Sequence, residues 1–189
     1  MKTVRHYHNG TILTSHKCGT KYLNKVFNVS GSENVIWYKD LFSYDFKWLI
    51  VRDPYEHLLS AITTVFNTKH NSRDLNNILT RFINGTDPHW NNTFYQVMLP
   101  HSFIHPFKLV ELSNLTHFVE HELGLNAPKF LPRYGTEILY LSKDSLVEKI
   151  KSEHKDEWDV LMGLVELEKS SYRMLFNGCD VYSPEFSFS

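Results

Sequence analysis

The stretch Phe46–Val51 reads Phe-Lys-Trp-Leu-Ile-Val and is followed at once by Arg52-Asp53-Pro54. A short, nearly continuous apolar run is typical of a strand that is buried on both faces of a parallel sheet. Asp is a preferred N-cap and Pro is favoured at the first helical position, so a helix is predicted from Pro54 to about Phe66. This unit of strand, turn and helix indicates an α/β fold.

A second unit of the same kind precedes it. β-Branched residues within Thr11–Ser15 predict a strand, Lys17–Lys21 predicts a loop, and apolar residues at helical spacing from Tyr22 to Phe27 predict a helix. Further strands are predicted at Phe107–Leu112 and Ile138–Leu141. Further helices are predicted at Leu75–Phe82, at Leu115–Leu123 with Gly124 closing it, after a cap at Ser142 or Asp144, and from Trp158 to Phe176.

Strands that alternate with helices predict a parallel sheet of about four or five strands flanked by helices, in one domain spanning residues 1–189. The composition, 42% hydrophobic and 22% charged residues, is that of a globular chain. A net charge of -1 provides no overall field for nucleic acid, so any basic site must be local.

The sequence contains no apolar run long enough to cross a membrane, and its first residues lack the apolar core of a signal peptide. These features predict a soluble, cytoplasmic protein. The two cysteines, Cys18 and Cys179, form neither a disulfide framework nor a metal-ligand spacing. His6 with His8, and His117 with His121, lack further ligands, so no metal is expected.

Two segments that follow predicted strands carry groups suited to anions. In Lys17-Cys18-Gly19-Thr20-Lys21, Gly19 permits close backbone approach and the lysines supply charge. Arg52 follows the buried strand with a planar guanidinium, and Ser60 lies two helical turns further on.

Each segment alone also fits an ordinary turn with solvent-facing lysines, or an arginine that forms a salt bridge. Ligands of open parallel sheets bind beyond the carboxyl ends of the strands, so the two segments together predict a ligand with two separated phosphates. A P-loop kinase is the less favoured alternative, because the Walker pattern Gly-x-x-x-x-Gly-Lys-Ser/Thr is absent.

His16–Phe27 (HKCGTKYLNKVF) resembles the 5′-phosphosulfate loop of sulfotransferases that use 3′-phosphoadenosine 5′-phosphosulfate (PAPS). Trp48–Ala61 (WLIVRDPYEHLLSA) is similar to their 3′-phosphate motif. Asp87–Trp90 and Phe107–Leu112 resemble segments of the carbohydrate sulfotransferases that modify chondroitin, dermatan and the HNK-1 glycan. The chain departs from that group at His57, where arginine is usual, and in lacking the membrane-anchored, cysteine-bearing architecture of the animal Golgi enzymes.

The resemblance implies a sulfotransferase fold and a role for each matching residue. Lys17 would contact the oxygen that bridges phosphate and sulfate, and Arg52 with Ser60 would bind the 3′-phosphate. The 5′-phosphate would be held by the rest of the loop, namely Cys18, Gly19, Thr20, Lys21 and Tyr22. Arg133, in Arg133-Tyr134-Gly135, is expected to add a contact to the 3′-phosphate, with Lys129 as a substitute.

A hydroxyl acceptor requires a general base. His89 is the first candidate, because histidine titrates near neutral pH, and Asp40 is the second. Trp90 is either a platform for a sugar ring or part of the core. The implied acceptor is a carbohydrate, with a protein tyrosine or a small alcohol as alternatives. The non-enzymatic hypothesis is an inactive nucleotide-binding module of the same fold.

Overall fold

The computed structural model describes residues 3–30, 34–68, 74–128 and 141–184. Its elements, in chain order, are β1 (Thr3–Tyr7), β2 (Ile12–Thr14), α1 (Thr20–Val26), β3 (Val35–Trp37), the 3-10 turn η1 (Tyr38–Ser43), β4 (Trp48–Val51), α2 (Pro54–Asn67), α3 (Leu75–Ile83), α4 (Phe94–Ile104), β5 (Lys108–Glu111), η2 (Leu112–Asn114), α5 (Leu115–His117) with the π-helical turn η3 (Phe118–Glu122), α6 (Lys143–Glu153) and α7 (Lys155–Gly178).

The strands form one mixed five-stranded sheet in the order β3-β1-β2-β4-β5, and helices flank it on both faces. β2, β4 and β5 are parallel, as predicted, whereas β1 runs antiparallel to both β2 and β3. The predicted all-parallel sheet is therefore wrong at this edge. The cause is a tight hairpin turn between β1 and β2, in which His8, Asn9 and Gly10 all have positive φ.

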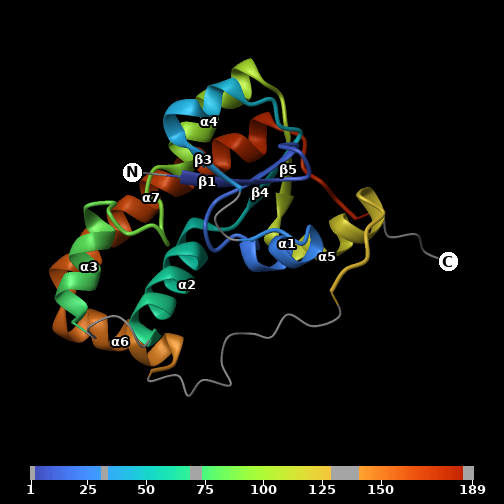
Figure 1. Cartoon of the computed structure of the whole chain (residues 1–189). Coiled ribbons are helices and arrows are strands. Elements are labelled where there is room, and N and C mark those ends of the chain that lie inside the picture. Colours follow the sequence, from blue (N-terminus) through green and yellow to red (C-terminus); the bar gives the residue numbers. More distant parts are fainter. Residues whose placement is uncertain (1–2, 31–33, 69–73, 129–140, 185–189) are drawn as a thin grey trace.

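The side chains of β4 alternate between two apolar layers. Leu49 and Val51 pack with α4 and the end of α7, while Ile50 packs with α1 and α5 on the other face. Figure 1 shows these two pairs of helices on opposite sides of the sheet. The two-sided burial predicted for this strand is confirmed, since all three side chains are fully buried.

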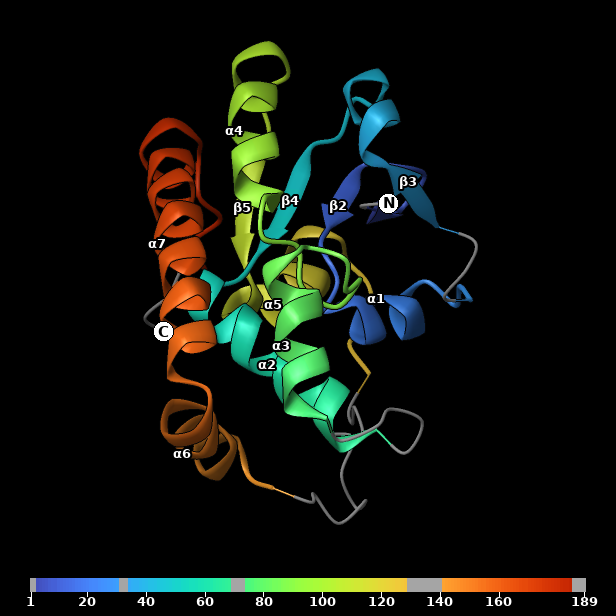
Figure 2. The ribbon, with the colours of Figure 1, turned by 90° about the vertical axis from the view of Figure 1, so that its left-hand side faces the viewer.

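A third apolar cluster joins α2, α3, α6 and the first half of α7 beyond the edge at which β2 and β4 end (Figure 2). α7 contacts both this cluster and the sheet. Its residues Trp158, Leu161 and Val165 belong to the cluster, and Leu175 belongs to the apolar layer between the sheet and α4. The long terminal helix thus fixes the helical cluster relative to the sheet.

The predicted helix starts are confirmed at two caps. The Asp53 carboxylate accepts a hydrogen bond from the Glu56 amide at 3.0 Å, and Ser142 accepts one from the Ser145 amide at 3.1 Å. Most of the predicted strand Ile138–Leu141 lies outside the described residues. Its last residue, Leu141, is described and does not belong to a strand. β1, β3 and α4 were not predicted. None of the described helices is both long and apolar enough to cross a membrane.

Candidate functional site

The loop between β2 and α1 is folded tightly upon itself. The Thr14 hydroxyl donates to the Cys18 carbonyl at 2.7 Å, and the Cys18 amide donates to the Ser15 carbonyl at 3.3 Å. Lys17 and Gly19 have left-handed backbones, with φ of 62° and 79°. This conformation is unusual for a lysine, so the backbone at Lys17 must be held by its surroundings.

Glycine is required at position 19 for two reasons. Its positive φ disfavours any residue with a Cβ, and an added Cβ would lie 2.5 Å from the Cδ2 atom of Leu115. The loop therefore packs directly on α5 through the bare backbone of Gly19.

Arg52 connects this loop to the end of β4. Its guanidinium Nη1 donates to the Lys17 carbonyl at 3.1 Å. Its own backbone is fixed by Tyr95 on α4, whose hydroxyl accepts from the Arg52 amide at 2.9 Å and donates to the Arg52 carbonyl at 2.5 Å. The structure thus brings the two predicted anion-binding segments into direct contact.

An open cleft of about 380 Å³ lies beside the loop. It is lined by His16, Lys17, Gly19, Thr20, Lys21, Tyr22, Ser60, Thr64 and His89. Eight of these nine residues have a side chain that can donate a hydrogen bond or carry positive charge, and none is acidic, so the cleft suits an anionic ligand. Arg52 is not among the lining residues and has a side chain that is 23% exposed.

Burial, with the charges of Lys21 and Arg52, lowers the pKa of the Lys17 ammonium to about 8. The charge of Asp87 acts in the opposite direction and raises this pKa. A bound anion would favour the protonated form and reverse this shift. Lys17 is therefore a cation whose unfavourable environment is relieved by negative charge in the cleft.

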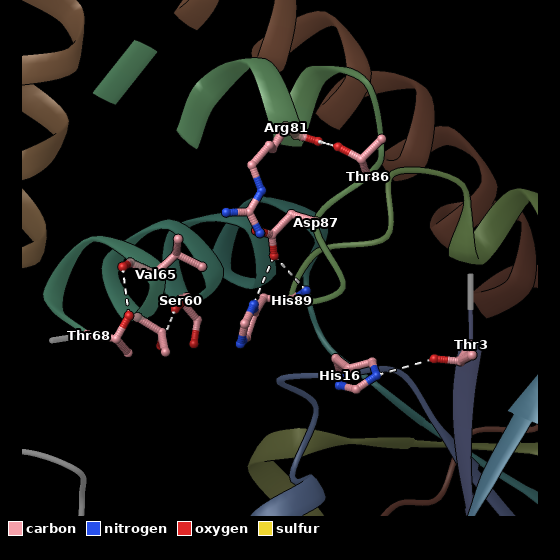
Figure 3. A network of polar contacts seen from close by, with 10 residues as sticks. Thr3, His16, Ser60, Val65, Thr68, Arg81, Thr86, Asp87 and His89 are labelled. Atoms are coloured by element: carbon pink, nitrogen blue, oxygen red, sulfur yellow. Dashed lines mark hydrogen bonds and ion pairs between the residues drawn. The ribbon is translucent and has the colours of Figure 1, made fainter. Parts of the chain in front are cut away.

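His89 is held by a neighbouring carboxylate. Its Nδ1 atom lies 2.8 Å from Asp87 Oδ1, and its amide donates to the same oxygen at 2.9 Å. Arg81 forms an ion pair with the other oxygen at 2.6 Å. Figure 3 shows Asp87 between Arg81 and His89, with Ser60 on one side of the His89 ring and His16 on the other.

Burial alone would raise the pKa of the Asp87 carboxyl, but the hydrogen bonds from His89, its charge and that of Arg81 together hold it below its usual value. An ionised carboxylate only accepts hydrogen bonds, so Nδ1 of His89 must carry the proton. When the ring is neutral, its Nε2 atom therefore carries no proton and can accept one. Catalytic pairs in which a carboxylate orients a histidine general base have the same arrangement.

Two other histidines stay uncharged at neutral pH. Burial, followed by the charges of Arg5, His89 and Lys17, lowers the pKa of His16 to about 4. Burial and the charge of Arg52 lower the pKa of His57 to about 3, and only 1% of this residue is exposed. His57 is thus a neutral core residue.

The predicted site residues divide into three groups. Lys17, Gly19, Thr20, Lys21, Tyr22, Ser60 and His89 line one cleft, and Arg52 contacts it through Lys17. Cys18 is fully buried with a pKa raised by burial to about 12, so only its backbone is available. Arg133 and Lys129 lie outside the described residues.

Asp40 does not reach this cleft. It lies in η1 after β3, which is separated from β2 by β1, and it is absent from the cleft lining. Trp90 is 1% exposed and packs against Phe82, so it belongs to the core and is not a sugar platform. Within the described residues, no group of three or more His, Cys, Asp and Glu side chains has an arrangement suited to a metal ion.

Sequence reasoning missed His16, Thr64, Asp87 and Tyr95. Signals existed for three of them: His16 directly precedes Lys17, Thr64 follows Ser60 by one helical turn, and Asp87 precedes His89 by two residues. Tyr95 has no local signal, because its contact with Arg52 spans 43 positions of the chain.

No protein-family model matches the chain, and neither a curated protein nor a solved structure matches it. The function must therefore be argued from the side chains of the cleft.

The close approach of Gly19 to Leu115 predicts the effect of Gly19→Ala. This variant combines a strained left-handed alanine with a clash, whereas Gly124→Ala has the strain (φ 64°) with open space around the added methyl group. We expect Gly19→Ala to lose about 1 to 3 kcal/mol more unfolding free energy than Gly124→Ala in urea denaturation. Equal losses would contradict the packing of this loop on α5.

Proposed function

We propose that this chain is a sulfotransferase that moves the sulfuryl group of PAPS to a hydroxyl of a carbohydrate acceptor. The observation that carries the proposal is the hydrogen bond from Arg52 to the Lys17 carbonyl, beside a cleft that also contains Ser60 and His89. One bisphosphorylated nucleotide requires two anion-binding groups close to each other. This contact sets Arg52 beside the loop of Lys17, and Lys17 and Ser60 both line the cleft.

Two features of the described residues support PAPS over a nucleoside triphosphate. The loop lacks the Walker lysine and its Ser/Thr, which would hold a triphosphate and its Mg²⁺. Arg52 and Ser60 form a second anion-binding pair apart from the loop, as a 3′-phosphate requires. The sulfotransferase fold itself is part of this proposal, and the mixed five-stranded α/β sheet is compatible with it.

The proposed reaction is an in-line displacement at sulfur. The acceptor oxygen forms a bond to sulfur while the bond between sulfur and the bridging oxygen breaks, and 3′-phosphoadenosine 5′-phosphate leaves with the electron pair. His89 Nε2 accepts the proton that the acceptor hydroxyl loses. Lys17 stabilises the negative charge that develops on the leaving phosphate, which it does more strongly in the transition state than in the ground state.

The preference for a bisphosphate is tested by thermal denaturation. We expect 3′-phosphoadenosine 5′-phosphate at about 100 times its Kd to stabilise the protein by about 2.7 kcal/mol and so to raise its Tm, whereas ATP with Mg²⁺ leaves the Tm nearly unchanged. Equal shifts from both nucleotides would favour a kinase-like site and contradict the proposal.

The lowered pKa of Lys17 predicts how nucleotide affinity varies with pH. The bound anion requires the ammonium, but the free protein loses this proton as the pH rises through about 8, so binding then includes the uptake of a proton. Once both phosphates are fully ionised, affinity for 3′-phosphoadenosine 5′-phosphate, measured by calorimetry, should stay constant up to that pH and fall by up to about tenfold per pH unit above it.

Lys17→Met should remove this fall and reduce turnover of PAPS by about a hundredfold or more. Lys25→Met, on the exposed side of α1, is the matched control and should keep both properties. A pH dependence that persists in Lys17→Met would exclude Lys17 as the responsible group.

The orientation of His89 by Asp87 predicts a catalytic defect without a binding defect. His89→Gln should lower turnover by about 10²- to 10⁴-fold while the Kd for 3′-phosphoadenosine 5′-phosphate stays within about twofold, because a carboxamide cannot accept the proton. His8→Gln, in the exposed turn between β1 and β2, should behave as wild type. Normal turnover in His89→Gln would eliminate His89 as the base.

A further inference from the structure

A chain of three charged residues links α6 to the second anion-binding segment. Lys143 Nζ lies 2.8 and 3.0 Å from the two carboxylate oxygens of Glu56, and Glu56 Oε2 lies 3.8 Å from Arg52 Nη2. Lys143 and Glu56 are 87 positions apart, so this is a tertiary contact that no sequence motif encodes.

Glu56 is a poor neighbour for a phosphate. It precedes Ser60 by four residues on α2 and therefore shares a helix face with it, next to Arg52. A phosphate bound between Arg52 and Ser60 would meet the negative charge of Glu56, which also competes for the guanidinium of Arg52. Like charges at close range oppose binding unless a cation compensates them.

Lys143 is positioned to compensate this charge. It is the first residue of α6, which Ser142 caps and which is packed through Leu146 and Ile150 into the cluster shared with α2. Two residues before it, Leu141 exchanges two hydrogen bonds of 3.3 Å with the Asn67 side chain at the end of α2. The backbone on both sides of Lys143 is thus fastened, and its side chain holds the Glu56 carboxylate in a bidentate ion pair.

We propose that Lys143 determines specificity for the 3′-phosphate by neutralising Glu56, which frees the Arg52 guanidinium for that phosphate. This inference rests on the proposed function, because it concerns the phosphate that distinguishes PAPS and its product from nucleotides with only a 5′-phosphate. Lys143 acts through Glu56 and is a positioning residue, not a catalytic one.

The test is a double-mutant cycle of Lys143→Met and Glu56→Gln. Kd values are measured by calorimetry for 3′-phosphoadenosine 5′-phosphate and for 5′-AMP, which lacks the 3′-phosphate. Lys149→Met is the matched control, since Lys149 also lies on α6, is as exposed as Lys143 and also forms an ion pair, but its partner is Glu153 of the same helix and not Glu56. Each variant is first shown to be folded by its thermal transition.

We expect Lys143→Met to weaken the bisphosphate by about fivefold and 5′-AMP hardly at all. Glu56→Gln should bind the bisphosphate at least as tightly as wild type, and Lys143→Met in the Glu56→Gln background should cost nothing further, because no charge remains to be neutralised. Lys149→Met should leave both Kd values unchanged.

Equal losses for the two nucleotides, or a loss that persists in the Glu56→Gln background, would overturn the role of Lys143 while leaving the proposed function intact. Failure of the wild-type protein to distinguish the bisphosphate from 5′-AMP would instead overturn the proposed function, and this inference with it.

Discussion

The candidate site depends on one hydrogen bond, from the Arg52 guanidinium to the Lys17 carbonyl at 3.1 Å. It joins the end of β4 to the loop after β2 and holds a lysine whose backbone has a φ of 62°. Arg52 is itself fixed by the Tyr95 hydroxyl, and the Tyr95 amide donates to the buried carboxylate of Glu168 on α7 at 2.9 Å. A relay of hydrogen bonds therefore runs from the terminal helix, through α4, to the anion-binding loop. Each member is buried or half-buried, so the loop geometry is set before any ligand arrives.

Burial and neighbouring charges together decide the charge state of the groups around the cleft. His16 and His57 are kept neutral, Lys17 is a weakened cation, and Asp87 is kept ionised by His89 and Arg81. One consequence is a division of roles: Lys17 gains from negative charge, while the oriented His89 leaves Nε2 as a proton acceptor. Two groups with opposite tasks can share a small space because their environments differ. The neutral state of His57 fits this pattern, since a second buried cation beside Arg52 would lower the pKa of Lys17 further.

Local patterns predicted much of the fold and of the site. The apolar run ending at Val51 and the cap at Asp53 each encode their structure within a few residues, and both were predicted correctly. The contact of Gly19 with Leu115 joins distant positions and was not predicted. The hairpin of β1 and β2 was missed although Asn9-Gly10 is a turn signal, because β1 was not recognised as a strand. The contacts of Tyr95 with Arg52 and of Lys143 with Glu56 depend on how distant segments pack, and no local spacing reports them. The place of Asp40 outside the cleft lining also depends on tertiary structure, because β1 lies between β2 and β3, the strand that precedes Asp40.

We propose that a single nucleotide bridges the loop of Lys17 and the pair formed by Arg52 and Ser60. The decisive measurement is a crystal structure of the complex with 3′-phosphoadenosine 5′-phosphate. We expect the 5′-phosphate within hydrogen-bond distance of Lys17 and Thr20 and the 3′-phosphate on Arg52 and Ser60, with His89 open to the space beyond the 5′-phosphate. A nucleotide bound elsewhere, or one whose 3′-phosphate points away from Arg52 into solvent, would contradict it.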